Sequence, residues 1–278
     1  MAKHELKKVG LDGAELSYIE VGEGDPVVLV HGSLDDFRTW SFQLEPLSRK
    51  YRVVAYSRRY HWPNEWSGDG SDYTAALHSK DLEALIDRLG LGPVHVIGAS
   101  FGAYVACLFA ARHPESLRSL VLGEPPLLPW LADSEEGTDL LADFLARAWF
   151  PSGQAFRRGQ TKQGVENFIR GVIGEDAFKT LPPHALEVML DNAPEMKLET
   201  QGACYLTPFT CEEAQRITAP ALLLDGEFSP RMFYVIEDEL ERCIPESERR
   251  VISGVGHAMH AQDPEAYNSI VLDFLERH

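Results

Sequence analysis

The pentapeptide Gly98-Ala99-Ser100-Phe101-Gly102 constrains this chain more than any other segment. An apolar, β-branched run at 94–97 precedes it and is typical of a buried strand, and an apolar run at 103–111 follows it and is typical of a buried helix. A serine between such elements lies on a tight turn that holds its hydroxyl out at the end of a sheet, with glycines where backbones pass closely. The helix would direct N–H groups and its positive dipole end at the same place. Taken alone, the pentapeptide could be a chance match in a glycine-containing turn.

The composition is that of a globular α/β protein. The chain has 278 residues, of which 44% are hydrophobic and 25% charged, enough for one large domain or a domain with an insertion. Its 43 acidic and 26 basic residues give a net charge of −17, which disfavours nucleic acid and anionic membranes as partners. No apolar run approaches the ~18 residues of a membrane span, and the N-terminus lacks the apolar stretch of a signal peptide. We therefore expect a cytoplasmic protein that acts on a small molecule; the oligomeric state stays open.

The four cysteines do not form a recognisable motif. Cys107, Cys204, Cys211 and Cys243 have neither C-x-x-C spacing nor a metal-ligand pattern. Cys107 lies in the apolar run after Ser100, where a buried small hydrophobic side chain is expected. We expect reduced cysteines, no metal site and no cofactor.

Strand patterns alternate with helical patterns over most of the chain. This alternation predicts an α/β fold with a mostly parallel central sheet and helices on both faces. The predicted strands are 15–20, 26–30, 51–56, 94–97, 117–122, 219–224 and 249–252, and the predicted helices are 74–89, 103–111 and 264–276.

The interval 127–217 breaks this rhythm. It contains helical patterns at 140–149 and 165–173, no convincing strand, and turn signals at Trp130, Pro151 and Pro182-Pro183. We interpret it as a helical cap inserted into a core formed by 1–126 and 218–278. An ordinary set of surface helices is the alternative.

Three motifs carry a family resemblance. Val30-His31-Gly32-Ser33, the pentapeptide at 98–102 and Gly254-Val255-Gly256-His257 occur in the chain order of capped α/β-hydrolase fold enzymes, which the chain resembles over nearly its whole length. The resemblance implies that Ser100 is a nucleophile and that His257 is its base, preferred over His260 because glycines flank it. It also implies an oxyanion hole made by the backbone N–H groups of Ser33 and Phe101.

The acid departs from the commonest family pattern. Many members place an aspartate where this chain has Ser229, in the loop that follows the strand after the cap. Glu124 ends the strand before the cap, and haloalkane dehalogenases and some lactone-opening serine hydrolases are similar in placing their acid there. We predict that Glu124 orients His257. Asp225 and Glu227 are the alternative acids, and a structural role at the strand end is the alternative for Glu124.

A basic and aromatic segment, 57–64, stands where the family often has an aspartate and a Gly-x-Gly loop. We favour the interpretation that its polar side chains hold the nucleophile turn in place. The alternative is that Arg58 or Arg59 attracts a substrate carboxylate.

Apolar residues follow the predicted catalytic positions along the chain, which favours an uncharged, fairly hydrophobic substrate. The expected reaction is hydrolysis of a carboxylic ester or lactone through an acyl-enzyme. The alternatives are hydrolysis of a carbon–carbon bond in a β-diketone or ring-fission product, a peroxidase-like side activity, and a receptor of the same fold with little turnover. The predicted substrate-binding residues are His31, Leu34, Phe37, Leu127 and Trp130, and Phe101 and Leu128 are further apolar neighbours.

Overall fold

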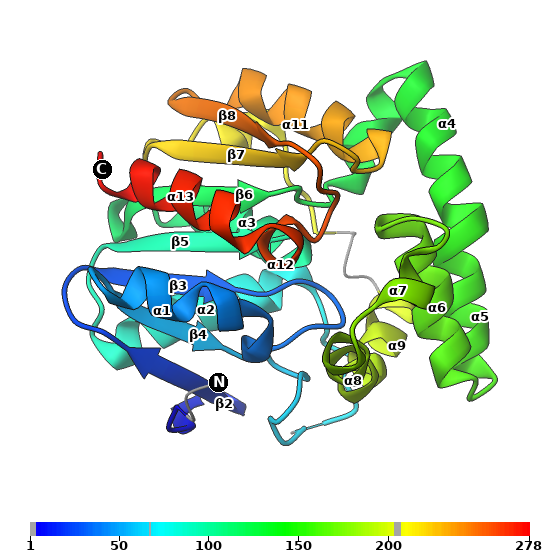
Figure 1. Ribbon diagram of the computed structural model, residues 1–278, viewed down its shortest axis with the longest axis horizontal. Helices are drawn as coiled ribbons and strands as arrows, with labels where there is room; N and C mark the ends of the chain where they lie inside the picture. The colour runs from blue at the N-terminus through cyan, green and yellow to red at the C-terminus, as the bar shows by residue number, and fades with distance from the viewer. Residues whose placement is uncertain (1–3, 67, 203–206) are drawn as a thin grey trace.

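One twisted sheet organises the molecule (Figure 1). The computed structural model describes residues 4–66, 68–202 and 207–278. Within them, eight strands follow the order β1-β2-β4-β3-β5-β6-β7-β8, with β2 antiparallel to its two neighbours and the other pairs parallel. The predicted α/β class is confirmed. The strands are β1 (Lys7–Leu11), β2 (Ala14–Val21), β3 (Pro26–Val30), β4 (Arg52–Tyr56), β5 (Val94–Ala99), β6 (Leu117–Gly123), β7 (Ala221–Gly226) and β8 (Ser247–Ile252).

Helices cover both faces of this sheet and enclose two hydrophobic cores. Along β3, Val28 and Val30 face the core under α2, α3 and α11, whereas Val27 and Leu29 face the core under α1 and α13. A strand buried on both faces needs apolar residues at every position, which explains the continuous apolar run of β3. These helices are α1 (Leu44–Ser48), α2 (Ala75–Leu89), α3 (Phe101–Arg112), α11 (Arg231–Cys243) and α13 (Pro264–Leu275), and the short ones are η1 (Phe37–Phe42), η2 (Pro114–Ser116) and α12 (Met259–Gln262).

The chain between β6 and β7 is helical and lies beyond the end of the sheet where the parallel strands finish (Figure 1). No strand occurs among the residues described for this segment, which spans the interval 127–217. Its helices are η3 (Leu128–Asp133), α4 (Glu135–Phe144), η4 (Leu145–Trp149), α5 (Phe150–Arg157), α6 (Thr161–Val172), α7 (Ala177–Thr180), α8 (Pro183–Asp191), α9 (Ala193–Gln201) and α10 (Cys211–Ala214).

The turn expected at Pro151 is absent. The π-helix η4 leads directly into α5, and Pro151 lies in the first turn of α5. Proline lacks an N–H and clashes with the preceding helical turn. A π-helical turn just before it is wider than an α-helical one, so the helix continues past the proline.

The expectation that the cysteines are all reduced is wrong for Cys211 and Cys243, which form a disulfide between α10 and α11. The two residues are 32 positions apart, so the disulfide cannot be predicted from a local sequence motif. Cys107 is buried and free, as predicted, and Cys204 lies outside the described residues.

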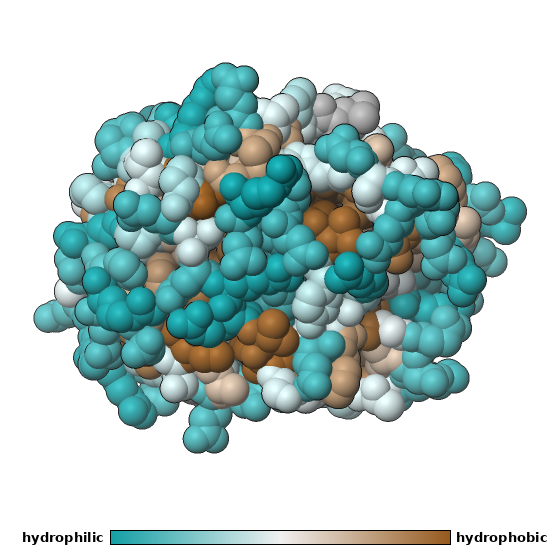
Figure 2. All heavy atoms as spheres, turned by 90° about the horizontal axis from the view of Figure 1, so that it is seen from above, coloured by the Kyte–Doolittle hydropathy of each residue, from teal (hydrophilic) through white to brown (hydrophobic). Residues whose placement is uncertain are grey.

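The hydropathy of the visible surface is consistent with the high content of charged residues. Seen from above, it is mostly hydrophilic, and the apolar residues gather in small separate patches (Figure 2). No helix in the described ranges is both long and apolar enough to cross a bilayer.

Candidate active site

Ser100 lies at the junction of β5 and α3 in a strained backbone conformation, with φ 52° and ψ −124°. The flanking glycines make this turn possible. A Cβ on Gly98 would lie 2.7 Å from the Cα of Ala103, and one on Gly102 would lie 2.2 Å from the carbonyl oxygen of Val30. The pentapeptide therefore reflects two close backbone approaches, and these set the serine hydroxyl at the end of the sheet.

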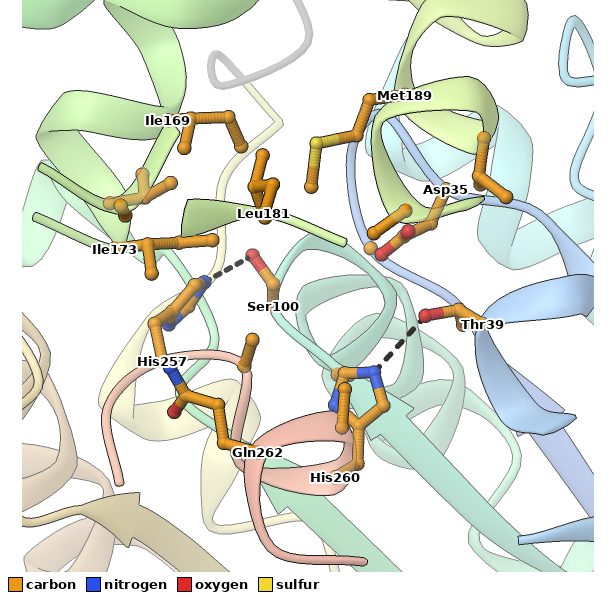
Figure 3. A pocket seen from close by; sticks show the side chains of 18 of the residues that line it. Asp35, Thr39, Ser100, Ile169, Ile173, Leu181, Met189, His257, His260 and Gln262 are labelled. Carbon is orange, nitrogen blue, oxygen red and sulfur yellow. Dashed lines mark hydrogen bonds between the residues drawn. The ribbon is translucent and has the colours of Figure 1, made fainter. Parts of the chain in front are cut away.

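His257 lies between Ser100 and Glu124. Its Nε2 is 3.0 Å from Oγ of Ser100 (Figure 3), and its Nδ1 is 2.5 Å from Oε2 of Glu124. The imidazole stacks on Phe233 of α11, with ring centroids 4.2 Å apart. Because a carboxylate accepts from Nδ1–H, Nε2 is left to accept the proton of the serine hydroxyl. The structure thus brings together the three side chains expected to form a catalytic triad.

Glu124 is fully buried and directly follows β6. Its Oε1 accepts a hydrogen bond from the N–H of Gly226, 2.8 Å away at the end of β7. Its own N–H donates to Oε1 of Glu237, 3.1 Å away, a carboxyl whose pKa burial holds well above the usual range. Burial therefore favours the neutral form of Glu237, and Glu124 is the carboxyl that contacts the imidazole of His257.

The alternative acids have other partners. Asp225 forms an ion pair with Arg249 at 2.6 Å. Glu227 accepts hydrogen bonds from the hydroxyl of Ser253 at 2.6 Å and from the N–H of Gly254 at 2.7 Å. Glu227 thus supports the loop that leads to His257 without contacting its ring.

The two predicted oxyanion donors lie beside the nucleophile. Ser33 and Ser100 line the same cavity, and a methyl group on Gly32 would lie 3.1 Å from the Cβ of Ser100. Phe101 is the first residue of α3 and directly follows Ser100. The loop that carries Ser33 and the start of α3 thus both adjoin Ser100, as the predicted oxyanion hole requires.

His31 supports this loop from within the core and is not at the cavity surface. Its ring is fully buried, and its Nε2 accepts a 2.9 Å hydrogen bond from the N–H of Arg58. Nδ1 therefore carries the proton and donates to the carbonyl of Gly32 at 2.9 Å. Burial and the charge of Arg58 hold the pKa of His31 well below its ordinary value, so the ring is neutral.

Both arginines of the basic segment serve the framework. The buried guanidinium of Arg58 donates to the carbonyls of His31 at 3.1 Å and Gly32 at 3.0 Å. Arg59 forms a two-pronged ion pair with Asp81 of α2, at 2.9 and 2.7 Å. This agrees with the favoured interpretation of polar contacts, although those of Arg58 hold the oxyanion loop rather than the nucleophile turn itself.

A cavity of about 430 Å³ opens over Ser100, in the size range of small-molecule sites (Figure 3). Its two sides differ in chemistry. The sheet side contributes polar groups, and the inserted helices contribute an apolar wall. The polar side includes Asp35, Arg38, Thr39, Ser41, His260 and Gln262, and the apolar wall includes Phe168, Ile169, Val172, Ile173, Leu181, Val188 and Met189.

The predicted substrate-binding residues are not among the residues that line this cavity. His31, Leu34 and Leu127 are buried in the protein interior. Phe37 stacks on Trp62, and Trp130 stacks on Phe209. These residues are close in sequence to the predicted catalytic positions but do not line the cavity. The apolar cavity wall is formed instead by helices that are distant in sequence from those positions. The apolar stripe at Phe168, Ile169 and Val172 was the signal that could have pointed to it.

One group of potential metal ligands occurs in the described part of the chain, comprising Cys211, Glu239 and Cys243. Its two sulfurs are joined in the disulfide, so they are not available as thiolates. The group does not line the cavity at Ser100.

The chain resembles known proteins along nearly its whole length. The chain is 28% identical over 274 residues to a 2-hydroxy-6-oxononadienedioate/2-hydroxy-6-oxononatrienedioate hydrolase of Pseudomonas putida, covering 94% of this chain and 92% of that protein. A thermophilic esterase from Thermogutta terrifontis superposes with a TM-score of 0.77 at 25% identity, over 98% of each chain. The N-acyl homoserine lactone degrading enzyme Est816 superposes with a TM-score of 0.76 at 22% identity, over 96% of this chain and all of the other. The sequence model of the α/β hydrolase fold matches residues 25–264. The chain therefore belongs to the α/β-hydrolase fold family.

Proposed function

We propose that this protein is a serine hydrolase that cleaves a carboxylic ester or lactone through an acyl-enzyme, with Ser100, His257 and Glu124 as its catalytic triad. The observation that carries the proposal is the hydrogen-bonded row from Ser100 through His257 to the buried Glu124, which opens on the cavity. A serine hydroxyl is a poor nucleophile unless a positioned base removes its proton.

Acylation begins when Nε2 of His257 takes the proton of Ser100 as Oγ attacks the carbonyl carbon. The negative charge on the carbonyl oxygen is stabilised by the N–H groups of Ser33 and Phe101. Glu124 stabilises the imidazolium, which then passes its proton to the departing alkoxide. A water molecule repeats the sequence on the acyl-enzyme, with His257 as its base, and releases the acid.

The cavity favours an uncharged substrate. Among the described residues that line the cavity, Arg38 is the only arginine, and there is no lysine. Its guanidinium forms ion pairs with Asp36 at 2.7 Å and with Asp191 at 2.9 Å. The opposite wall is apolar and suits a hydrocarbon portion. The relative from Pseudomonas putida keeps carbon–carbon bond hydrolysis as an alternative outcome on the same residues.

A fluorophosphonate probe tests the nucleophile without knowledge of the substrate. We expect mass spectrometry to locate the label on Ser100 in the wild type, and labelling to be lost in Ser100→Ala and slowed by orders of magnitude in His257→Ala. Glu227→Gln, which removes a carboxylate outside the triad, is the matched control and should label normally. Absence of label on Ser100 in folded wild type would contradict the proposal.

A substrate panel then separates the reactions. It holds p-nitrophenyl esters, simple and macrocyclic lactones and a vinylogous diketone, with proton release as the readout. We expect turnover of esters or lactones that falls by at least ~10³-fold in Ser100→Ala. Turnover of the diketone alone would assign carbon–carbon bond hydrolysis, and no turnover together with tight binding would assign a receptor.

A further inference from the structure

Asp35 is a carboxylate beside the nucleophile that the proposed mechanism does not use. It lines the cavity near Ser100 (Figure 3). A methyl group on Gly32 would lie 3.1 Å from Cβ of Ser100 and 3.7 Å from Oδ2 of Asp35. The carboxylate and the nucleophile therefore border the same small volume, where the carbonyl of a substrate and its first substituents would lie.

The neighbouring carboxylate, Asp36, has the contacts expected of a structural residue in this loop. Asp36 is fully buried and is held by Arg38 and by the amide of Asn192 at 2.7 Å. Asp35, by contrast, has no ion-pair partner within the described residues. A half-buried carboxylate without a cationic partner costs free energy that a ligand with a hydrogen-bond donor would recover.

A row of side chains leads to Asp35 from the core. Oγ1 of Thr39 is 3.1 Å from Nε2 of His260 (Figure 3), and the hydroxyl of Thr39 favours the ionised form of Asp35 by hydrogen bonding. Burial lowers the pKa of His260 to about 4, so its ring is neutral. A proton on its Nε2 would point to Oγ1 of Thr39, which leaves the threonine hydroxyl proton available to Asp35. The row ends on an acceptor at the cavity.

The position of His257 decides which part of a substrate Asp35 faces. The leaving group must lie beside Nε2 of His257, since it takes its proton from there. Asp35 and Thr39 lie across Ser100 from His257 (Figure 3). The acyl portion, not the alcohol, therefore extends to Asp35.

From this geometry, and resting on the proposed function, we infer that Asp35 selects esters or lactones whose acyl portion carries a neutral hydrogen-bond donor, a hydroxyl or amide N–H, on the first or second carbon from the carbonyl. The carboxylate accepts this donor, while the hydrocarbon remainder lies on the apolar wall of Ile169, Leu181 and Met189.

A neutral donor suits this site better than an ammonium group. Arg38 lines the same cavity, and although it is ion-paired with Asp36 and Asp191, its guanidinium still places a positive group inside the site. Burial and the neighbouring Asp36 raise the pKa of Asp35 to about 7, which limits its charge at neutral pH. A hydroxyl donates to the ionised carboxylate and accepts from the protonated acid, so it is bound in both states.

The test compares p-nitrophenyl butanoate with both enantiomers of p-nitrophenyl 3-hydroxybutanoate. In the wild type, kcat/KM for one hydroxy ester should exceed that for butanoate by tenfold or more. In Asp35→Leu, this ratio should fall to about one or below. Asp139→Asn, at an exposed position on α4, is the control and should leave the ratio unchanged.

Two kinetic results would overturn the inference: a ratio near one in the wild type, or a high ratio that Asp35→Leu leaves intact. A still higher preference for the 3-ammonio ester would overturn the assignment of a neutral donor. Thermal unfolding of Asp35→Leu checks that a change in ratio does not come from misfolding.

A binding measurement separates this inference from the proposed function. Ligand-observed NMR compares butanamide with 3-hydroxybutanamide on Ser100→Ala and on Ser100→Ala combined with Asp35→Leu. Even if no ester is turned over, we expect Ser100→Ala to bind the hydroxy amide more tightly and the double variant to lose that preference. Equal affinity of both ligands for Ser100→Ala contradicts the role of Asp35, whether or not the protein is a hydrolase.

Discussion

At the scale of single residues, three of the four non-glycine residues with positive φ in the described ranges lie at the candidate site, Tyr60 being the fourth. Leu34, Ser100 and Glu124 are non-glycine residues with positive φ, at 59°, 52° and 49°. Each such residue costs on the order of 1–3 kcal/mol, which the surrounding structure must offset. The three lie in the loop of the predicted oxyanion hole, at the proposed nucleophile and at the proposed triad acid. The strained backbone at these positions therefore helps to direct a hydroxyl, an N–H group and a carboxylate towards the same site.

Glu124→Gln should lower kcat by about 10³–10⁴-fold with little change in KM. Its amide N–H would donate to Nδ1 of His257 and place the ring proton on Nε2, where the serine proton must go. Steady-state kinetics on any ester turned over by the wild type measure this. The control Glu227→Gln should retain full kcat, and an unchanged kcat in Glu124→Gln would return Asp225 and Glu227 to consideration.

His95 should make the protein sensitive to acid. Burial lowers its pKa to about 4, whereas the unfolded chain has a histidine pKa of about 6.5. Between these values the unfolded state binds more protons, so the contribution of His95 to stability is present above pH 6.5 and is lost as the pH falls towards 4, by ~2–3 kcal/mol. Urea unfolding of wild type and His95→Gln at several pH values should show the wild type losing more stability in this window.

The matched control for this pH effect is His184→Gln, because His184 is exposed at the start of α8. Its unfolding free energy should follow that of the wild type across the same pH range. Parallel curves for wild type and His95→Gln would show that His95 does not contribute to acid sensitivity.

At the scale of elements, α9 of the inserted segment is joined to the oxyanion loop. Glu195 on α9 is fully buried, and its carboxyl accepts hydrogen bonds of 2.7 Å from the N–H of Leu34 and from the hydroxyl of Tyr73. Burial and Glu199 raise the pKa of Glu195 to about 8, so it is largely protonated at neutral pH. The loop that carries Ser33 thus depends on a side chain from 161 positions further along the chain.

Glu195→Ala should lower the free energy of unfolding by about 1–3 kcal/mol and kcat/KM by about tenfold. The buried N–H of Leu34 loses its acceptor, and the adjacent oxyanion donor loses its fixed position. Glu195→Gln keeps a neutral acceptor and should restore most of kcat. The measurements are urea unfolding and ester kinetics, with Glu187→Ala at an exposed position on α8 as the control.

At the scale of the whole molecule, the disulfide ties the end of the inserted segment to a core helix. Closing a loop of this length stabilises a folded chain by about 3–4 kcal/mol in the chain-entropy view. Cys243→Ser should therefore lower the midpoint of urea unfolding. A reductant should lower the midpoint of the wild-type protein to a similar value. Non-reducing peptide mapping should recover the Cys211–Cys243 pair. A reductant-independent midpoint would contradict a structural role for this bond.

The sequence alone determined the elements with strong local patterns. The buried strands, the turn at Ser100 and the terminal helix were predictable because alternating or continuous apolar runs and required glycines are properties of neighbouring residues. The amphipathic helix α11 was missed although Met232, Phe233, Ile236 and Leu240 form one apolar face. The edge strand β1 was missed because none of its five residues is buried and its short sequence shows little apolar alternation.

The tertiary structure decided everything that depends on residues distant along the chain. Ser100 and His257 could be chosen from motifs, and Glu124 could be chosen from its place at the end of a strand together with the family resemblance. Four features could not be predicted from motifs. They are the cavity wall, the inward direction of Arg58, the pairing of Cys211 with Cys243, and the exposure of Asp35 to the cavity. Each depends on how helices from the inserted segment pack against the sheet, and local sequence patterns do not encode distances between segments a hundred residues apart.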